Sequence, residues 1–146
     1  MIDMKRAALA LTLLFAPLGA HSALADTPRG TWAMSNGKVT VKVDGCGGNL
    51  CARIVGLKEP ISKLDGKPKV DRENPDPGKR KRPLVGLSIL IGMKPAGDNL
   101  WKGAIYNPDD GKTYSATVRY DGGRSMKVKG CVAGVFCKTN VFVRNN

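Results

Sequence analysis

The sequence has 146 residues with 24 Lys or Arg against 12 Asp or Glu, which gives a formal net charge of +12. A chain of this length predicts one domain with a single modest core, and the basic excess favours anionic partners. The single histidine is His21, near the N-terminus. The rest of the chain therefore lacks the residue on which Ser-His-Asp catalysis, Cys-His catalysis and His-ligated zinc depend.

Residues 1–25 have the three parts of a secretory signal peptide. The basic pair Lys5-Arg6 precedes an apolar run over residues 7–18, and small residues before Ala25 resemble a cleavage motif. The apolar run is too short to cross a bilayer, so we expect no transmembrane anchor. Cleavage after Ala25 removes two basic residues and one acidic residue, which lowers the formal charge from +12 to +11. We expect a mature protein in the periplasm or outside the cell.

Four cysteines follow the signal segment, and an even number in an exported chain predicts two disulfides. Three pairings are possible. Their spacings of five and six residues suit closures across two tight hairpins, so we favour Cys46 with Cys51 and Cys131 with Cys137. A four-cysteine zinc site is the alternative, although neither pair has the two-residue gap common in such sites. We expect no metal and no cofactor.

The first strands alternate with glycine turns. Residues 30–34 predict a short strand, and Val39, Val41 and Val43 alternate with polar residues in the period of a half-buried strand. The glycines of the Cys46 to Cys51 segment suit a tight turn, because glycine adopts positive φ at little cost. A third strand is predicted over residues 51–57.

A long polar segment over residues 63–82 interrupts this pattern. It carries eight basic and four acidic side chains, and its prolines limit regular structure. A loop of this length in a small domain is typically functional or disordered. The motif Asn74-Pro75-Asp76-Pro77 favours an ordered turn, because each proline fixes its own φ and restricts the residue before it. We therefore place the candidate site here.

The second half predicts five further strands. The apolar run Leu84 to Ile91 is expected to be buried on both faces, with a bend at Gly86. The turn residues of segment 107–112 join the next two strands into a hairpin. The remaining strand candidates are residues 101–106, 113–120, 125–130 and 137–144. Eight strand candidates without an amphipathic helix predict an all-β domain over residues 26–146, either a single antiparallel up-and-down β-barrel or a strongly curled sheet. A β-sandwich is the alternative.

A set of motifs extends over nearly the whole mature chain. Its members are the Cys46 to Cys51 hairpin, Asn74-Pro75-Asp76-Pro77, Arg82-Pro83-Leu84 with Gly86-Leu87, Trp101, Ile105-Tyr106 with Pro108, Asp110-Gly111-Lys112-Thr113-Tyr114, Gly130-Cys131 and Phe136-Cys137. Together these motifs resemble the domain of unknown function 2147 family of exported bacterial proteins. The resemblance implies a compact secreted β-domain with no established catalytic residues.

Gly30-Thr31-Trp32 lies in the first predicted strand, and Arg144 lies near the end of the last one. These two features resemble the calycins, the lipocalin-like ligand-binding barrels, which have a Gly-x-Trp in their first strand and an arginine near the end of their last strand. The resemblance implies that Arg144 lies against the ring of Trp32 in a lipocalin-like barrel. Trp32 can equally plug one end of a barrel that holds no ligand.

Candidate ligand-binding side chains come from the long loop and the hairpin around residues 107–112. Residues 79–82 can clamp a phosphate or carboxylate, with Arg making bidentate contacts, or can form a solvated basic run. Tyrosines on the hairpin can orient a ligand if they face the barrel interior, although tyrosines that only pack a core are commoner. The candidate set is Asp71, Asn74, Asp76, Arg80, Arg82, Tyr106, Asp110, Lys112 and Tyr114.

The leading functional hypothesis is a periplasmic, non-enzymatic binding protein for a small apolar or anionic ligand or an envelope component. The first alternative is a protein-interaction or envelope-assembly module whose barrel is filled by its own side chains. The second is a carboxylate-dependent hydrolase, since paired acids can cleave glycosides without histidine. Residues 63–82 contain no aromatic side chain on which bases can stack, so we expect no nucleic-acid partner.

Overall fold

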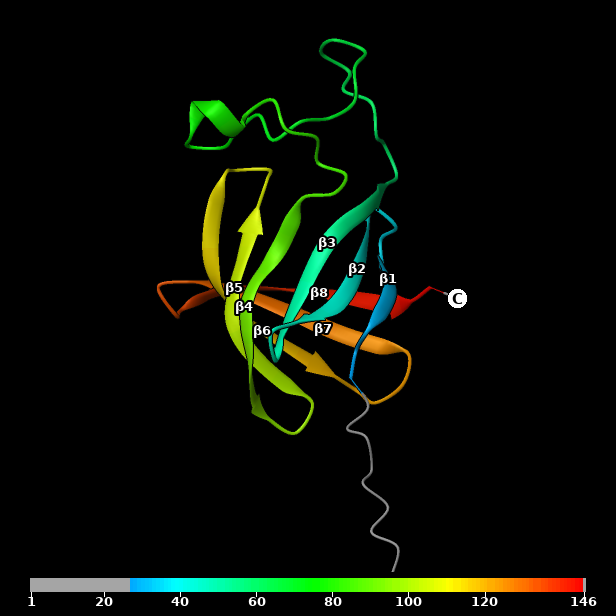
Figure 1. Ribbon diagram of the computed structural model, residues 1–146, viewed down its shortest axis with the longest axis vertical. Coiled ribbons are helices and arrows are strands. Elements are labelled where there is room, and N and C mark those ends of the chain that lie inside the picture. The colour runs from blue at the N-terminus through cyan, green and yellow to red at the C-terminus, as the bar shows by residue number, and fades with distance from the viewer. Residues whose placement is uncertain (1–26, 146) are drawn as a thin grey trace, which may run out of the picture.

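The computed structural model describes residues 27–145, which form a closed barrel of eight antiparallel strands (Figure 1). Each strand pairs with the next along the chain, and β1 closes the barrel by pairing with β8. The strands are β1 (Gly30–Met34), β2 (Val39–Cys46), β3 (Asn49–Leu57), β4 (Ser88–Gly97), β5 (Leu100–Asn107), β6 (Lys112–Tyr120), β7 (Ser125–Val132) and β8 (Phe136–Arg144). The predicted up-and-down barrel is therefore confirmed. The signal-peptide prediction concerns residues outside the described range.

Alternation of side chains along each strand places the core inside the barrel. In β2, Val41 and Val43 are buried while Lys42 between them is exposed, as expected where successive side chains point to opposite faces. The same period puts Ala52 and Ile54 of β3 inside. The core predicted from alternating residues is therefore found, and it lies at the centre of one closed sheet.

The strand predicted over residues 84–91 is wrong at both ends, because β4 spans Ser88–Gly97. The backbone turns at Gly86, which has a φ of +96°, and the amide of Leu87 donates to the carbonyl of Leu84. The expected burial on both faces is also wrong, since Ile91 is 47% exposed. β4 forms part of a barrel wall, so its outward side chains meet solvent.

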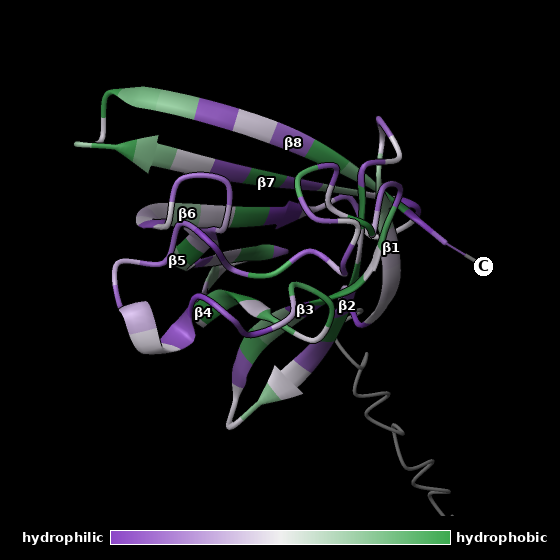
Figure 2. Ribbon diagram, turned by 90° about the horizontal axis from the view of Figure 1, so that it is seen from above, coloured by the Kyte–Doolittle hydropathy of each residue, from purple (hydrophilic) through white to green (hydrophobic). Residues whose placement is uncertain are grey.

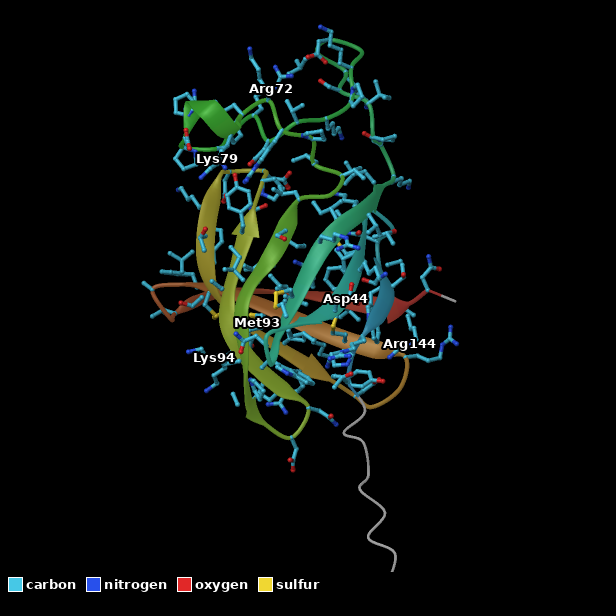
Figure 3. The ribbon with its side chains drawn as sticks, in the orientation of Figure 1. Asp44, Arg72, Lys79, Met93, Lys94 and Arg144 are labelled. Atoms are coloured by element: carbon cyan, nitrogen blue, oxygen red, sulfur yellow. A yellow bond between two sulfur atoms is a disulfide. The ribbon has the colours of Figure 1, made fainter. Side chains whose placement is uncertain are left out.

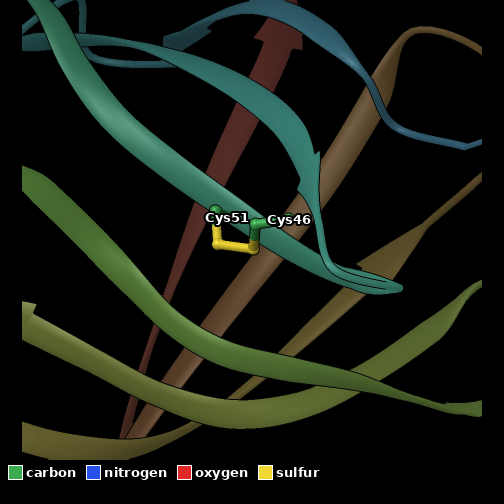
Figure 4. The surroundings of a disulfide bond; sticks show 2 residues. All are labelled: Cys46 and Cys51. Carbon is green, nitrogen blue, oxygen red and sulfur yellow. A yellow bond between two sulfur atoms is a disulfide. The ribbon is translucent and has the colours of Figure 1, made fainter.

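Both favoured disulfides are confirmed. Cys46 and Cys51 are joined across the β2–β3 turn (Figure 4), and Cys131 and Cys137 are joined between β7 and β8. Within residues 27–145 no cysteine is free. The alternative of a four-cysteine zinc site is therefore wrong, because all four sulfur atoms are used in covalent bonds.

One end of the barrel is closed by a stack of aromatic and cationic side chains. The Arg144 guanidinium lies 4.4 Å from the centre of the Trp32 ring, and the Tyr120 ring meets Trp32 edge-on. Arg144 Nη2 donates to Tyr120 Oη at 3.0 Å and Nη1 donates to the Arg29 carbonyl at 2.8 Å. Trp32 is fully buried, and its Nε1 donates to the Pro28 carbonyl. This contact of Arg144 with Trp32 is the one that the calycin resemblance implied.

The other end carries a long loop over residues 58–87, between β3 and β4 (green, top of Figure 1). Figure 3 shows Arg72 and Lys79 on this loop, well separated from Arg144. The loop is ordered by two isolated β-bridges and by the short 3-10 helix η1 (Pro77–Lys79). We call this end the loop end and the opposite one the closed end. Within residues 27–145, no helix is long and apolar enough to cross a membrane.

Candidate functional site

A fully buried carboxylate, Asp71, ties the long loop to the barrel. Tyr106 Oη, at the end of β5, donates to Asp71 Oδ1 at 2.6 Å. Asn74 Nδ2 donates to Asp71 Oδ2 at 2.8 Å, and Arg82 reaches the same oxygen from Nε at 2.8 Å and Nη2 at 2.7 Å. Asn74 Nδ2 also lies 2.9 Å from Tyr106 Oη. We call these four side chains the loop anchor.

Local backbone pairing brings the two charged members of the loop anchor together. Val70 and Pro83 form an isolated antiparallel bridge, and the Asp71 amide donates to the Arg82 carbonyl at 2.9 Å. Neighbouring residues in an antiparallel pair hold their side chains close to one another. Asp71 and Arg82 therefore meet although 11 positions separate them in the sequence.

The proline-rich segment supplies the third member of the loop anchor. Asn74 Oδ1 accepts from the Asp76 amide at 2.9 Å, and Asp76 Oδ1 in turn accepts from the Gly78 amide at the start of η1. Arg80 Nε donates to the Asn74 carbonyl at 2.7 Å. The ordered turn predicted for this motif is confirmed, and it directs the Asn74 amide at Asp71.

The electrostatics of the loop anchor favour a charged Asp71. Burial raises the pKa of this carboxyl, but hydrogen bonds from Tyr106, Asn74 and Arg82 outweigh burial and hold the pKa below its ordinary value. Burial is the larger cause that raises the pKa of Tyr106, and the hydrogen bond to Asp71 is the smaller one. The phenol therefore stays protonated and donates its hydrogen bond. Within residues 27–145 no buried side-chain nitrogen or oxygen lacks a partner. The loop anchor therefore has a structural role, because its buried polar atoms are already hydrogen-bonded within the chain.

A close backbone contact supports the loop beside the anchor. Gly111, in the β5–β6 turn, has a φ of +69°, and a β-carbon placed there would lie 1.9 Å from the Glu73 carbonyl oxygen. Glycine is required here on both counts, because other residues strain at this φ and a side chain would collide with the loop. The loop thus rests directly on the β5–β6 turn.

Next to the anchored loop, the loop end of the barrel contains a cavity of about 960 Å³. Its walls come from the ends of all eight strands that face the long loop, and from the loop itself. Its apolar side chains are Met34, Val39, Ile54, Leu57, Leu84, Ile89, Ile105, Val128, Val132, Phe136 and Phe142. The barrel is therefore hollow at the loop end, while at the closed end the ring of Trp32 is fully buried.

Four lysines, Lys38, Lys58, Lys69 and Lys138, line the same cavity. Among the ion pairs of residues 27–145, none involves these four ammonium groups. The lining carboxylates are Glu59, Asp109 and Asp110, of which Glu59 pairs with Lys63 and Asp110 accepts hydrogen bonds from Tyr114 Oη and the Lys112 amide. The lining therefore offers cationic groups to a ligand more readily than anionic ones.

The Asp110–Tyr114 pair fixes the cavity side of the β5–β6 hairpin. Burial raises the pKa of Asp110, but the bonds from Tyr114 and the Lys112 amide outweigh it, so the pKa lies below its ordinary value. The bond to Asp110 raises the pKa of Tyr114. At neutral pH the pair is a carboxylate that accepts from a neutral phenol, so the pair carries one negative charge whose oxygens are already hydrogen-bonded within the hairpin.

The nine side chains predicted as a site fall into two groups. Of the nine, Tyr106, Asp110 and Tyr114 line the cavity. The others do not line it: Asp71, Asn74 and Arg82 belong to the loop anchor, Asp76 and Arg80 support the turn beside it, and Lys112 is exposed. The structure thus brings the candidates to one end of the barrel, while most of them hold the loop.

Sequence reasoning missed the four lining lysines. Lys38 lies between β1 and β2, Lys58 and Lys69 lie in the long loop, and Lys138 is in β8. Lys38, Lys58 and Lys138 stand at or near a strand end that faces the long loop, whereas Lys69 lies within that loop. In an up-and-down barrel alternate strand ends gather at one rim, so this position was the signal that could have found the first three.

A closed eight-stranded antiparallel barrel with a Trp–Arg closed end and a cavity at the other end defines a lipocalin-like barrel. The chain belongs to the family described as "Uncharacterized protein conserved in bacteria (DUF2147)", whose model matches residues 30–144. The predicted family is therefore confirmed. No curated protein matches the chain.

One solved structure with the same fold is the protein HP1028 from the human pathogen Helicobacter pylori, described as belonging to the lipocalin family. The two structures superpose with a TM-score of 0.69 and share 24% sequence identity. The similarity covers 81% of this chain and 82% of that one. At this identity the likeness establishes the fold of the barrel.

Proposed function

We propose that this protein binds a small amphiphile, with the apolar part of the ligand inside the barrel and its anionic group beside the lining lysines. The observation that carries the proposal is the cavity of about 960 Å³, which combines apolar walls with four lysines that take part in no ion pair within residues 27–145. Protein pockets for small ligands typically have volumes of about 300–1,000 Å³ and mostly apolar linings.

The expected ligand is a single-chain carboxylate or phosphate ester. Each buried methylene contributes about 0.8 kcal/mol, so the chain supplies most of the affinity. The lysines add attraction for the head group and set its orientation at the mouth. This chemistry matches the sequence-based expectation of an apolar or anionic ligand and narrows it to a molecule with both properties.

The proposed activity is binding without catalysis, in an exported protein. The carboxylate Asp71, one of the acids considered for hydrolysis, has both oxygens occupied by partners within the chain. The signal pattern of residues 1–25 and the two disulfides support a location outside the cytoplasm.

The alternative of a filled barrel does not fit the cavity. A filled barrel requires side chains that reach the axis at both ends, as Trp32 does at the closed end. At the loop end the side chains leave a cavity, and Gly130 contributes no side chain to its lining. The cavity therefore supports the binding hypothesis more than the interaction module.

The test is calorimetric titration of the protein with decanoate and with decanol. Both ligands should bind, because both bury the same chain. Decanoate should bind more tightly at low salt, and its advantage should shrink as salt screens the lysines, with a Debye length of about 8 Å at physiological ionic strength. Absence of binding by both molecules would contradict the proposal.

Two variants separate the parts of the proposed site. Lys38→Gln combined with Lys138→Gln should weaken decanoate binding several-fold and leave decanol binding unchanged. Val39→Trp, which places a large ring in the cavity, should weaken both ligands. If the lysine variant weakened both equally while keeping its melting temperature, the head group would not lie beside these lysines.

A further inference from the structure

The β7–β8 hairpin ends in an apolar tip that projects beyond the barrel (orange, left of Figure 1; Figure 2). Val132 is 50% exposed, Val135 75% and Phe136 76%. Single exposed apolar residues are common on protein surfaces, but several on one projecting turn mark an interaction surface. We call these three residues the hairpin tip.

The hairpin tip is stiff. The Cys131–Cys137 disulfide joins directly opposed residues of β7 and β8, just below the tip. The Val135 amide donates to the Val132 carbonyl at 3.1 Å and closes the turn. A preorganised surface loses little conformational entropy on binding, so even a small apolar tip can contribute to attachment.

The charge around the hairpin tip indicates which kind of surface it contacts. Lys127, Lys129 and Lys138 are exposed on the two strands, and residues 122–145 contain no Asp or Glu. A second copy of the chain would bring like charges together, which opposes self-association. An anionic lipid surface offers both partners that this hairpin needs, an apolar interior and negative head groups.

We propose that the hairpin tip docks on membranes that contain anionic lipids, with Val135 and Phe136 entering the head-group region and Lys129 meeting the lipid phosphates. Val132, Phe136 and Lys138 also line the cavity. Docking in this way brings the cavity mouth to the lipid surface. The proposal stands apart from ligand binding, because the hairpin can attach whether or not the cavity is occupied.

The long loop offers a matched control surface. Leu64 is 81% exposed, more than any residue of the hairpin tip. It is flanked by Lys63 and by Asp65, which pairs with Arg72. Leu64 therefore tests whether exposure of an apolar side chain is enough for membrane contact.

The experiment uses Val135→Trp and Leu64→Trp with vesicles of phosphatidylcholine mixed with phosphatidylglycerol. Tryptophan emission should shift to the blue and be quenched by brominated lipid at position 135, with no change at position 64. The wild-type protein supplies the background emission, which comes from the buried Trp32 and the partly buried Trp101. Equal quenching at both positions, or none at position 135, would overturn the proposal.

Two further variants measure the apolar and the charged contributions by vesicle sedimentation. Val135→Asp should lower the partition coefficient by at least about tenfold, as expected for a lost apolar side chain. Lys129→Gln should lower it by about fivefold on phosphatidylglycerol vesicles and leave it unchanged on phosphatidylcholine alone. Neither residue lines the cavity, so decanoate binding should persist in both variants.

Self-association is the outcome that would replace the proposal. Analytical ultracentrifugation without lipid should show no concentration-dependent dimer for the wild type. A dimer that Val135→Asp dissociates, with no vesicle binding by either protein, would show that the hairpin tip is covered by a second copy.

Discussion

The two ends of the barrel are held by different chemistry. The closed end packs Trp32, Tyr120 and Arg144 into one stack. The loop end is held by a buried carboxylate, Asp71, and by a backbone contact at Gly111, and it contains an open cavity. The stacked side chains of the closed end fill the space between them. The polar anchor of the loop end fixes the loop at a few points and leaves space beside it. The difference explains how one small barrel can be both closed and hollow.

The largest expected effect is at the closed end. Trp32→Ala should cost about 3 to 5 kcal/mol in the free energy of unfolding, because a fully buried ring is removed and Arg144 loses the surface on which it lies. Trp101→Ala is the control, since this ring is only partly buried and should cost less. Denaturant titration measures both. Equal losses of unfolding free energy in the two variants would show that Trp32 stabilises the barrel no more than Trp101 does.

The next effect is at the contact between turn and loop. Gly111→Ala should cost about 3 kcal/mol, because alanine at positive φ costs about 1–2 kcal/mol and its β-carbon would also meet the Glu73 carbonyl. Gly122→Ala is the control, with a φ of +80° and no atom within 4 Å of the added carbon. Thermal unfolding of both variants isolates the contact. Equal melting temperatures for the Gly111→Ala and Gly122→Ala variants would show that the loop does not rest on this turn.

The loop anchor should contribute less than the closed end. Asp71→Asn removes the charge that Arg82 and Tyr106 contact, and should cost about 1–3 kcal/mol because the remaining polar groups lose a partner. Arg82 is partly exposed and can turn to water, which limits the loss. Hydrogen exchange should show that backbone amides of the variant exchange faster, with the increase in rate concentrated in residues 58–87.

The same substitution elsewhere on the loop provides the matched control. Asp65 pairs with Arg72 at 3.1 Å, but both side chains are exposed. Asp65→Asn should therefore leave exchange and melting nearly unchanged, as exposed ion pairs contribute about 0–1 kcal/mol. A larger effect from Asp65 than from Asp71 would contradict the assignment of the loop anchor.

The smallest expected effect is a dependence of loop protection on pH. The folded-state pKa of Asp71 is depressed, so its contribution to stability is complete above the unfolded pKa of about 4 and is lost as the pH falls through the folded-state value. Pepsin digestion at decreasing pH should therefore cut residues 58–87 before the barrel unfolds. In Asp71→Asn the loop should be cut already at the highest pH tested.

The fold could be predicted from the sequence because its signals are local. Val39, Val41 and Val43 alternate at the strand period, and the spacing of Cys46 and Cys51 matches a hairpin. The closed end followed from a resemblance that paired Trp32 with Arg144, and the structure confirms that contact.

For the candidate site, the sequence predicted that the long loop and the hairpin around residues 107–112 lie together at one end of the barrel, but not which partners most candidates contact. Asp71 was a candidate ligand-binding residue, but its carboxylate bonds to Tyr106, 35 positions away in the sequence. Whether a carboxylate is buried depends on such distant partners, which no local pattern reveals. The lining lysines were missed for the same reason, as closure of the barrel brings together four positions from separate segments.

The pairing of β1 with β8 has a consequence for chain connectivity. Trp32 lies opposite Arg144, and the Asn145 amide donates to the Thr31 carbonyl at 2.9 Å, so the two extremities of the barrel domain adjoin. A short glycine-serine bridge between them, with new termini opened beside Leu64 in the long loop, should yield a circular permutant. Every strand keeps its paired neighbours in the permuted chain. The barrel should therefore fold although its strands follow one another in a different order along the sequence.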